Sequence, residues 1–292
     1  VLLDSDYIIQ RSGENFRKLM LTFDDDTGKS MCLRPDLTVA YCIKYLKDNS
    51  KANSKIFYSG QAYRRSNNLK DKVINDQLGI EILSSKNKSS DDLKILKTIT
   101  NSIKKIKIKN TSIKVGDVSL FQKLIESLNI PERWKMRLKR HFWRPEYFED
   151  LLNRLETNSD IDPATVNIDK KKFSEMKNLD QNNEIANRKV SEILSRFDRK
   201  IKDPRSFAEN KKIARIIREF LKINCEIDKI EKTLIDFVKK NNLSKKVFKD
   251  LSTIKNLSKI NSKTIFSTNF GRDIEYYTGI VFEIYNSSKK EI

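Results

Sequence analysis

Residues 270–283 read FGRDIEYYTGIVFE, the most unusual string in the chain. Two tyrosines, Tyr276 and Tyr277, stand between a glycine turn and an apolar run that predicts a buried strand. Such residues can wall a small polar pocket, in which Arg272 supplies a fixed cation for a carboxylate. The same tyrosines could instead pack against neighbouring helices, and the local spacing does not decide between these two interpretations.

Two earlier segments also place charged residues beside predicted strands. Residues 34–38 read RPDLT, where Asp36 could hold a ligand ammonium or simply cap the following helix. Arg64 leaves one predicted strand, while Gln77 and Glu81 lie four apart on the next and therefore share a face. The side chains on that face could hydrogen-bond to an imidazole and an amine, although half-exposed polar positions are common on sheets.

The rest of the chain divides into a mixed part and a helical part. Short extended runs and helical spacings alternate up to about residue 130. From residue 131 to 261, apolar residues recur at three- and four-residue intervals, which predicts helices. Strand-like sequence returns at 263–267 and 279–285, so the simplest architecture is a sheet domain interrupted by a helical insertion. The helices expected in the insertion cover residues 146–155, 184–197, 206–221 and 227–240.

Taken in order, the three charged segments resemble a known family. The set of 34–38, Tyr63-Arg64 with 77–81, and 272–283 is similar to the catalytic core of histidyl-tRNA synthetase and of its paralogue, the regulatory subunit of ATP phosphoribosyltransferase. The resemblance implies an α+β fold of the class II aminoacyl-tRNA synthetase type, an antiparallel sheet flanked by helices, with a helical insertion. The implied division is a core of residues 1–130 and 262–292 and an insertion of residues 131–261.

The resemblance also implies a pocket for histidine. Arg64 and Arg272 would face the carboxylate of this ligand, while Asp36, Gln77 and Glu81 would face its amine and imidazole. A zwitterion with a ring NH needs both signs of charge and a hydrogen-bonding amide within one pocket. The implied histidine-binding residues are Asp36, Arg64, Gln77, Glu81, Arg272, Tyr276 and Tyr277.

Departures from the synthetase pattern fall mainly on the ATP side of this site. Ser66 stands where the synthetase has a glutamate that helps hold ATP, and a serine cannot replace that carboxylate. Leu37 adds bulk where the synthetase has glycine, and Asn75-Asp76 replaces a phenylalanine-histidine pair. The third class II motif, with its ATP-binding arginine, is not found in the 292 residues. The resemblance therefore favours a regulatory subunit, with no catalytic residues, cofactor or metal, over a divergent histidine-tRNA ligase that forms histidyl-adenylate.

The same resemblance implies partners. A regulatory subunit would enable a short catalytic subunit to transfer phosphoribose to ATP, and would contribute to feedback inhibition by histidine. It implies a hetero-oligomer in which this subunit also dimerises. Residues 115–121 and 138–147 look like the proteobacterial branch of that subunit. Within them, Phe142 and Trp143 could either pack inside the insertion or anchor a subunit contact.

Composition and charge exclude several other classes of protein. At 38% hydrophobic residues the chain can bury a core, yet no stretch approaches the ~18 consecutive apolar residues of a membrane span. Asp4 and Asp6 stand where a signal peptide needs a basic and then an apolar start, so we expect a cytoplasmic protein. The chain has three cysteines without C-x-x-C spacing, which argues against a disulfide scaffold and a zinc ribbon, and we expect them to be reduced and buried. His141 is the single histidine, so a site that needs two imidazoles is excluded. The net charge of +19 is spread over small groups of lysines, which indicates a solvated surface rather than a nucleic-acid partner.

Overall fold

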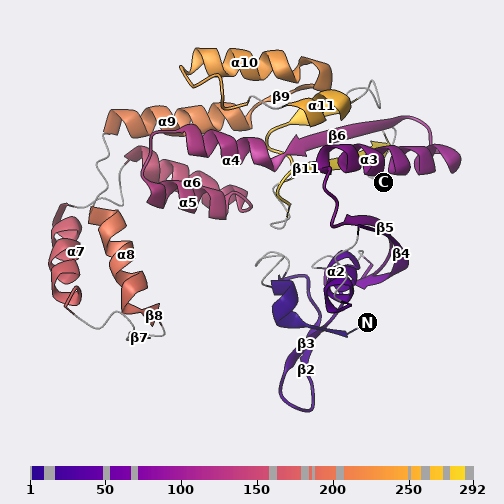
Figure 1. Cartoon of the computed structure of the whole chain (residues 1–292), viewed down its shortest axis with the longest axis horizontal. Coiled ribbons are helices and arrows are strands. Elements are labelled where there is room, and N and C mark those ends of the chain that lie inside the picture. Colours follow the sequence, from indigo (N-terminus) through magenta and orange to yellow (C-terminus); the bar gives the residue numbers. More distant parts are fainter. Residues whose placement is uncertain are drawn as a thin grey trace.

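The computed structural model describes residues 2–9, 17–48, 53–66, 72–157, 163–178, 184–185, 188–201, 207–248, 251–257, 264–271 and 277–286. Its strands form four separate sheets, and most of its helices gather around the largest of them (Figure 1). Within these ranges, no helix has the length and apolar character that crossing a membrane requires.

The largest sheet has four strands in the order β11-β6-β10-β9. β6 (Thr111–Asp117) pairs antiparallel with β11 (Ile280–Asn286) on one side and parallel with β10 (Thr264–Ser267) on the other. β9 (Asn224–Glu226) pairs antiparallel with β10. This sheet is therefore assembled from segments that lie about 150 residues apart in the chain.

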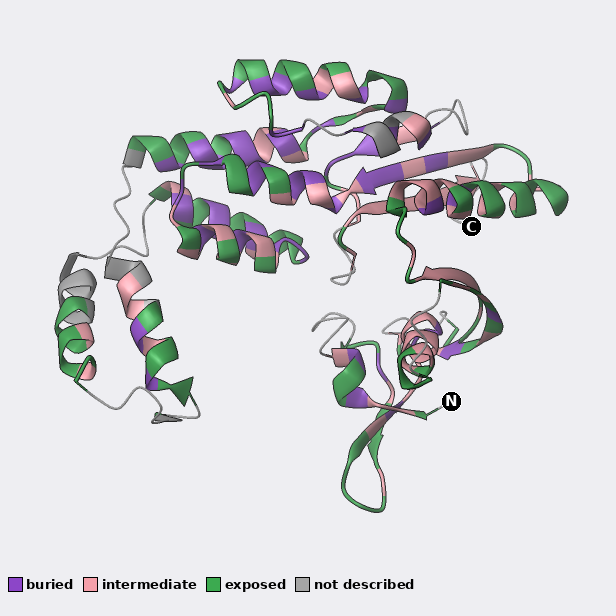
Figure 2. Cartoon of the chain, viewed as in Figure 1, coloured by how far each residue is buried: buried purple, intermediate pink, exposed green. Residues whose placement is uncertain are grey.

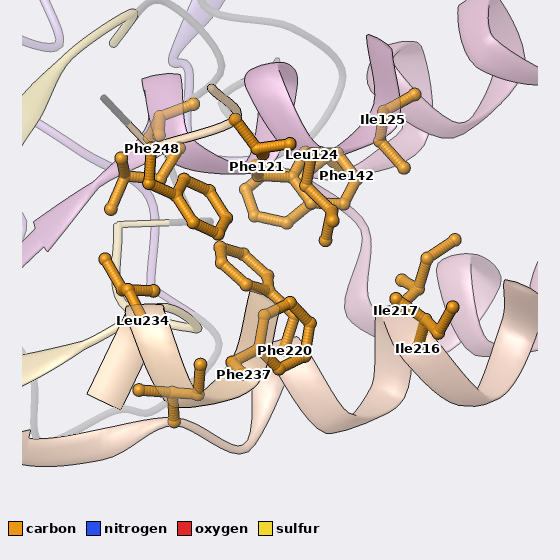
Figure 3. Close-up of a cluster of buried hydrophobic side chains, with 14 of the residues drawn as sticks. Phe121, Leu124, Ile125, Phe142, Ile216, Ile217, Phe220, Leu234, Phe237 and Phe248 are labelled. Carbon is orange, nitrogen blue, oxygen red and sulfur yellow. The ribbon is translucent and has the colours of Figure 1, made fainter. Parts of the chain in front are cut away.

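One hydrophobic core joins this sheet to the helices (Figure 3). Phe121 stacks on Phe142 with ring centroids 3.8 Å apart, and Phe220 stacks on Phe248 at 5.7 Å. Val115 of β6 belongs to the same cluster, so residues on both sides of position 131 share one core. The helices that surround it are α3 (Lys88–Lys105), α4 (Val118–Ser127), α5 (Glu132–His141), α6 (Pro145–Thr157), α9 (Phe207–Leu221), α10 (Ile230–Lys240) after the 3-10 turn η1 (Ile227–Lys229), and α11 (Ser252–Leu257).

Phe142 and Trp143 lie inside this packing. Their exposed fractions are 2% and 8%, so the proposed role of these aromatics as an exposed subunit contact is wrong, and packing within the helical segment is confirmed. His141, which precedes them, meets the ring of Tyr147 edge-on with centroids 4.7 Å apart. Burial lowers the pKa of His141, and the neighbouring arginines add to this effect.

Two polar contacts fix α9. Thr268, which follows β10, donates its hydroxyl to the carbonyl of Phe220 at the end of α9 and is buried. Arg218 crosses from α9 to α6, and its side chain is three-quarters buried. It donates to Glu149 at 2.6 Å, to Asn153 at 2.7 Å and to Glu156 at 2.7 Å.

A helical pair, α7 (Pro163–Met176) and α8 (Val190–Ile201), stands at one side of the main body (Figure 1). The helix predicted to start at residue 184 begins at Val190 instead, because β7 (Glu184–Ile185) and β8 (Arg188–Lys189) form a short antiparallel pair before it. The apolar spacing that supports a helix begins only at Val190, which is completely buried. The other predicted helices of the segment match α6, α9 and α10.

The N-terminal part forms a group of its own around a small core of Ile8, Met20 and Cys32. Of the other two cysteines, Cys42 and Cys225 are only half-buried, so the expectation of buried thiols is confirmed for Cys32 alone. Figure 2 shows that this group exposes far more of its surface than β6 does. Its elements are β1 (Leu2–Asp4), β2 (Thr22–Asp24), β3 (Ser30–Leu33), α2 (Thr38–Lys47), β4 (Ser54–Tyr63) and β5 (Ile74–Leu83).

Candidate functional site

The candidate site lies where residues 34–38 enter α2 beside the hairpin of β4 and β5. Two hydrogen bonds tie the RPDLT segment to β4. Arg34 donates from Nε to the carbonyl of Gln61 at 2.8 Å, and the amide of Tyr63 donates to the carbonyl of Arg34 at 3.0 Å. The start of α2 is therefore held against one face of the hairpin.

Asp36 is the most buried charged residue of this region, with 3% of its surface exposed. Its Oδ1 accepts the amide of Val39 at 2.9 Å, which confirms that it caps the first turn of α2. Its Oδ2 is buried and has no hydrogen-bond partner among the described residues. Burial raises the pKa of Asp36, while the charge of Arg64 opposes this rise. An unpaired buried oxygen is costly, so this atom is suited to receive a ligand donor.

Arg64 follows the last residue of β4 and lies beside the RPDLT segment that contains Asp36. Its Nε donates to the carbonyl of Pro35 at 2.7 Å, and its amide donates to the carbonyl of Val73 at 2.9 Å. The first bond fixes the guanidinium beside the RPDLT segment, and the second closes the base of the loop between the strands. A guanidinium held in this way places a fixed positive charge beside the segment, and such a charge can attract a carboxylate.

Gln77 and Glu81 lie on β5 and share one face of the hairpin, as their spacing predicts. Gln77 accepts the amide of Leu37 on its Oε1 at 3.0 Å. Glu81 accepts the hydroxyl of Tyr58 on its Oε1 at 2.8 Å, and that hydroxyl also lies 2.7 Å from the Oγ1 of Thr38. Gln77 thus contacts the start of α2 directly, and Glu81 is linked to it through the hydroxyl of Tyr58.

Tyr58 is the residue that the sequence analysis missed. It lies opposite Gly79 in the register of β4 and β5, and a Cβ at Gly79 would lie only 2.1 Å from the tyrosine ring. The ring also stacks on Tyr41 of α2 with centroids 4.8 Å apart. Burial raises the pKa of Tyr58, so its hydroxyl stays protonated and can donate to Glu81. A glycine opposite a tyrosine on a strand pair is the sequence signal that could have revealed this contact.

Of the other three predicted site residues, Arg272, Tyr276 and Tyr277, the structure describes only Tyr277. Tyr277 is half-buried and packs against the main core, near the start of β11. Arg272 and Tyr276 lie outside the described residues. The structure therefore brings together Asp36, Arg64, Gln77 and Glu81.

The chemistry of this group is that of binding. Two carboxylates, a guanidinium and an amide around one helix start can hold a small zwitterion through both of its charges. Cys42 also faces the carboxylates, but burial raises the pKa of its thiol, and Glu81 and Asp36 raise it further. A protonated thiol is a poor nucleophile. Among the described residues, no three histidine, cysteine or acidic side chains come together as a metal site would need.

Comparisons with known proteins show which family and fold the chain resembles. A curated ATP phosphoribosyltransferase regulatory subunit from Allorhizobium ampelinum is 23% identical over 97% of this chain and 80% of its own length. A solved ATP phosphoribosyltransferase regulatory subunit/histidyl-tRNA synthetase from Bacillus halodurans matches 99% of this chain with a TM-score of 0.57 and 16% identity. A solved histidyl-tRNA synthetase from Nostoc sp. PCC 7120 also matches 99% of it, with a TM-score of 0.54 and 15% identity.

These structural matches confirm the predicted α+β fold of the class II synthetase type. The chain spans 63% of the Bacillus halodurans protein and 56% of the Nostoc protein, under two thirds of each. The family model described as histidyl-tRNA synthetase matches residues 4–292. Since that match covers almost every residue, the chain belongs to the histidyl-tRNA synthetase family.

Proposed function

We propose that this protein is a regulatory subunit of ATP phosphoribosyltransferase, acts in the first step of histidine biosynthesis, and carries no catalytic centre of its own. The proposal is carried by a difference between the two sides of the site: the residues suited to histidine are present, whereas a residue that a synthetase uses toward ATP is replaced. Asp36, Arg64, Gln77 and Glu81 form one connected group suited to histidine, whereas Ser66 replaces the glutamate that a synthetase uses toward ATP. Similarity to curated regulatory subunits over nearly the whole chain supports the same conclusion.

In this proposal histidine binds at the start of α2. Its ammonium approaches the unpaired Oδ2 of Asp36, and its carboxylate approaches Arg64. Its imidazole lies along β5, where Gln77 and Glu81 supply hydrogen-bonding groups. Arg272, Tyr276 and Tyr277 are proposed to complete the wall, as the family resemblance implies.

Regulation requires that histidine prefer one state of an assembly. A ligand changes a partner's rate only when it binds two states of the complex with different affinity. The proposed complex pairs this subunit, itself dimeric, with a short catalytic subunit in the cytoplasm. The catalytic subunit transfers phosphoribose to ATP, this subunit raises that activity, and bound histidine lowers it.

The direct test measures phosphoribosyl-ATP formation by the short catalytic subunit from the same source. The rate is expected to rise when this protein is added and to fall as histidine is titrated. Glu81→Gln should raise the half-inhibitory histidine concentration about tenfold or more, because a hydrogen bond to a charged group contributes about 1.5–3 kcal/mol. Glu192→Gln, an exposed change on α8, is the matched control and should leave inhibition unchanged.

A second candidate is a divergent histidine-tRNA ligase. The family to which the chain belongs and its structural likeness to the Nostoc synthetase favour this function. A ligase must form histidyl-adenylate, so it would catalyse histidine-dependent exchange of pyrophosphate into ATP. Exchange activity without any effect on the catalytic subunit would overturn the regulatory proposal and establish the ligase.

A further inference from the structure

A small cavity lies between the start of α3, the start of α4 and the residues that lead into β11. Its volume is about 160 Å³. This volume is well below the ~300–1,000 Å³ of sites for drug-sized ligands. A ligand here must therefore be a small metabolite. It shares no lining residue with the group around Asp36.

Charges of both signs face this cavity. Lys88 and Asp92 come from α3, Asp117 ends β6, and Lys123 lies on α4. Buried Ile254 of α11 supplies an apolar wall. A surface that combines two ammonium groups, two carboxylates and an apolar wall is complementary to a zwitterion with an apolar side chain.

Three of the four charges form no hydrogen bond or ion pair within the part of the chain that the structure describes. Lys88, Asp92 and Lys123 make no hydrogen bond or ion pair through their side chains with any described residue. Other charged side chains of α3 do pair, because the Nζ of Lys94 lies 2.8 Å from the Oδ1 of Asp91. Since these three side chains face the cavity and make no such contact with the described residues, they can bind a ligand there.

The fourth charge is fixed in place. Asp117 accepts the amide of Ser119 on its Oδ1 at 2.9 Å and so caps α4. On the opposite side, the Nζ of Lys88 lies 2.9 Å from where a Cβ at Gly279 would be, so glycine leaves room for the ammonium. Burial raises the pKa of Asp92, and Asp117 adds to that rise against the opposing charge of Lys88. A bound cation would relieve this repulsion.

We propose that this cavity binds a free α-amino acid with an apolar side chain. Its ammonium lies between Asp92 and Asp117, and its carboxylate lies between Lys88 and Lys123. Its side chain packs on Ile254. The inference is independent of the proposed function, since it uses none of the residues assigned to histidine at the start of α2.

Isothermal titration calorimetry of the whole chain tests the proposal. The probes are glycine, L-leucine, L-methionine and L-histidine, with leucinamide and isocaproate as compounds that keep only one of the two charges. At least one apolar amino acid is expected to bind once per chain with a Kd below about 1 mM, and both single-charge compounds at least about tenfold more weakly. Failure of every amino acid to bind with a Kd below about 1 mM would overturn the proposal.

Variants assign the bound amino acid to the cavity. Asp92→Asn and Lys123→Met should each weaken binding about tenfold or more, because each removes one charged partner. Lys97→Met, an exposed change on the same helix as Asp92, is the control and should bind as the wild type does. Binding that Glu81→Gln abolishes and Asp92→Asn leaves intact belongs to the first site and would also refute this inference. If Asp92→Asn does not fold, the affinity of Lys123→Met, an exposed change, shows whether the amino acid binds in this cavity.

Discussion

Replacing Gly79 with alanine should destabilise the hairpin that carries Gln77 and Glu81. The new methyl group would lie 2.1 Å from Cζ, 2.2 Å from Cε2 and 2.3 Å from the hydroxyl of Tyr58. No carbon atoms approach this closely, and Tyr58 is only 3% exposed, so its ring must leave its place. The movement would break the stack on Tyr41 and the hydrogen bond to Glu81.

The size of the effect can be worked from these contacts. An aromatic stack contributes about 0.5–1.5 kcal/mol and a hydrogen bond to a charged group about 1.5–3 kcal/mol. Alanine in place of glycine within a strand returns about 0.5–1 kcal/mol. The free energy of unfolding should therefore fall by about 1–4 kcal/mol. Urea unfolding followed by near-ultraviolet circular dichroism, which reports on tyrosine packing, measures this change.

Two further variants test whether the contact between residue 79 and the ring of Tyr58 causes the loss of stability. Gly60→Ala lies on the partner strand, where the nearest atom is the flexible end of Arg34 at 3.1 Å, so it should cost less than about 0.5 kcal/mol. In a Tyr58→Leu background the ring is gone, so Gly79→Ala should then be nearly neutral. A clash with Tyr58 is refuted as the cause if Gly79→Ala is as stable as the wild type, or if its cost is the same with and without Tyr58.

Three other predictions follow from contacts described above. Burial raises the pKa of Asp36 above its ordinary value of 3.8, so the free energy of unfolding of the wild type should fall as pH rises from that value through the raised pKa. Asp36→Asn lacks this titration, so its stability relative to the wild type should increase over the same pH window, as measured by urea unfolding at stepped pH. Arg218→Met should lower the free energy of unfolding by about 1–3 kcal/mol, whereas Arg215→Met, which removes an exposed ion pair that spans 3.9 Å, should change it by less than about 0.5 kcal/mol. Equal costs of the two variants in urea unfolding would refute the role of the α6–α9 contact. Thr268→Val keeps the shape but removes the buried hydroxyl, so it should cost about 1–2 kcal/mol, and an unchanged melting temperature would contradict this.

Local signals were enough to predict the parts of the fold that depend on neighbouring residues. Capping of the following helix was one of two interpretations of Asp36 in the RPDLT segment, and the cap of α2 could be foreseen because capping involves residues two or three apart. The four-residue spacing of Gln77 and Glu81 predicted their common face, because side chains on a strand alternate. The helices α6, α9 and α10 likewise follow from apolar periodicity.

Contacts between distant segments could not be predicted in this way. β9 has three residues and gains its stability by pairing with β10, which lies about 40 residues later in the chain. Tyr58 reaches the site because the register of β4 and β5, whose residues are far apart in the sequence, places it over Gly79. The group around Asp36 was predicted in part, since the residue types were visible but the tyrosine that orients Glu81 was not.

The position of β6 in its sheet has a consequence for synthesis of the protein in the cell. Both of its neighbours, β10 and β11, emerge from the ribosome about 150 residues after it. At about 5–20 residues per second, β6 must wait roughly 7–30 s for the strands that satisfy its backbone. During that interval Ile113 and Val115, which are completely buried in the folded chain, are exposed on an unpaired strand. A nascent chain stalled between residues 130 and 260 should therefore bind general chaperones strongly, and release from them should coincide with the appearance of residues 264–286.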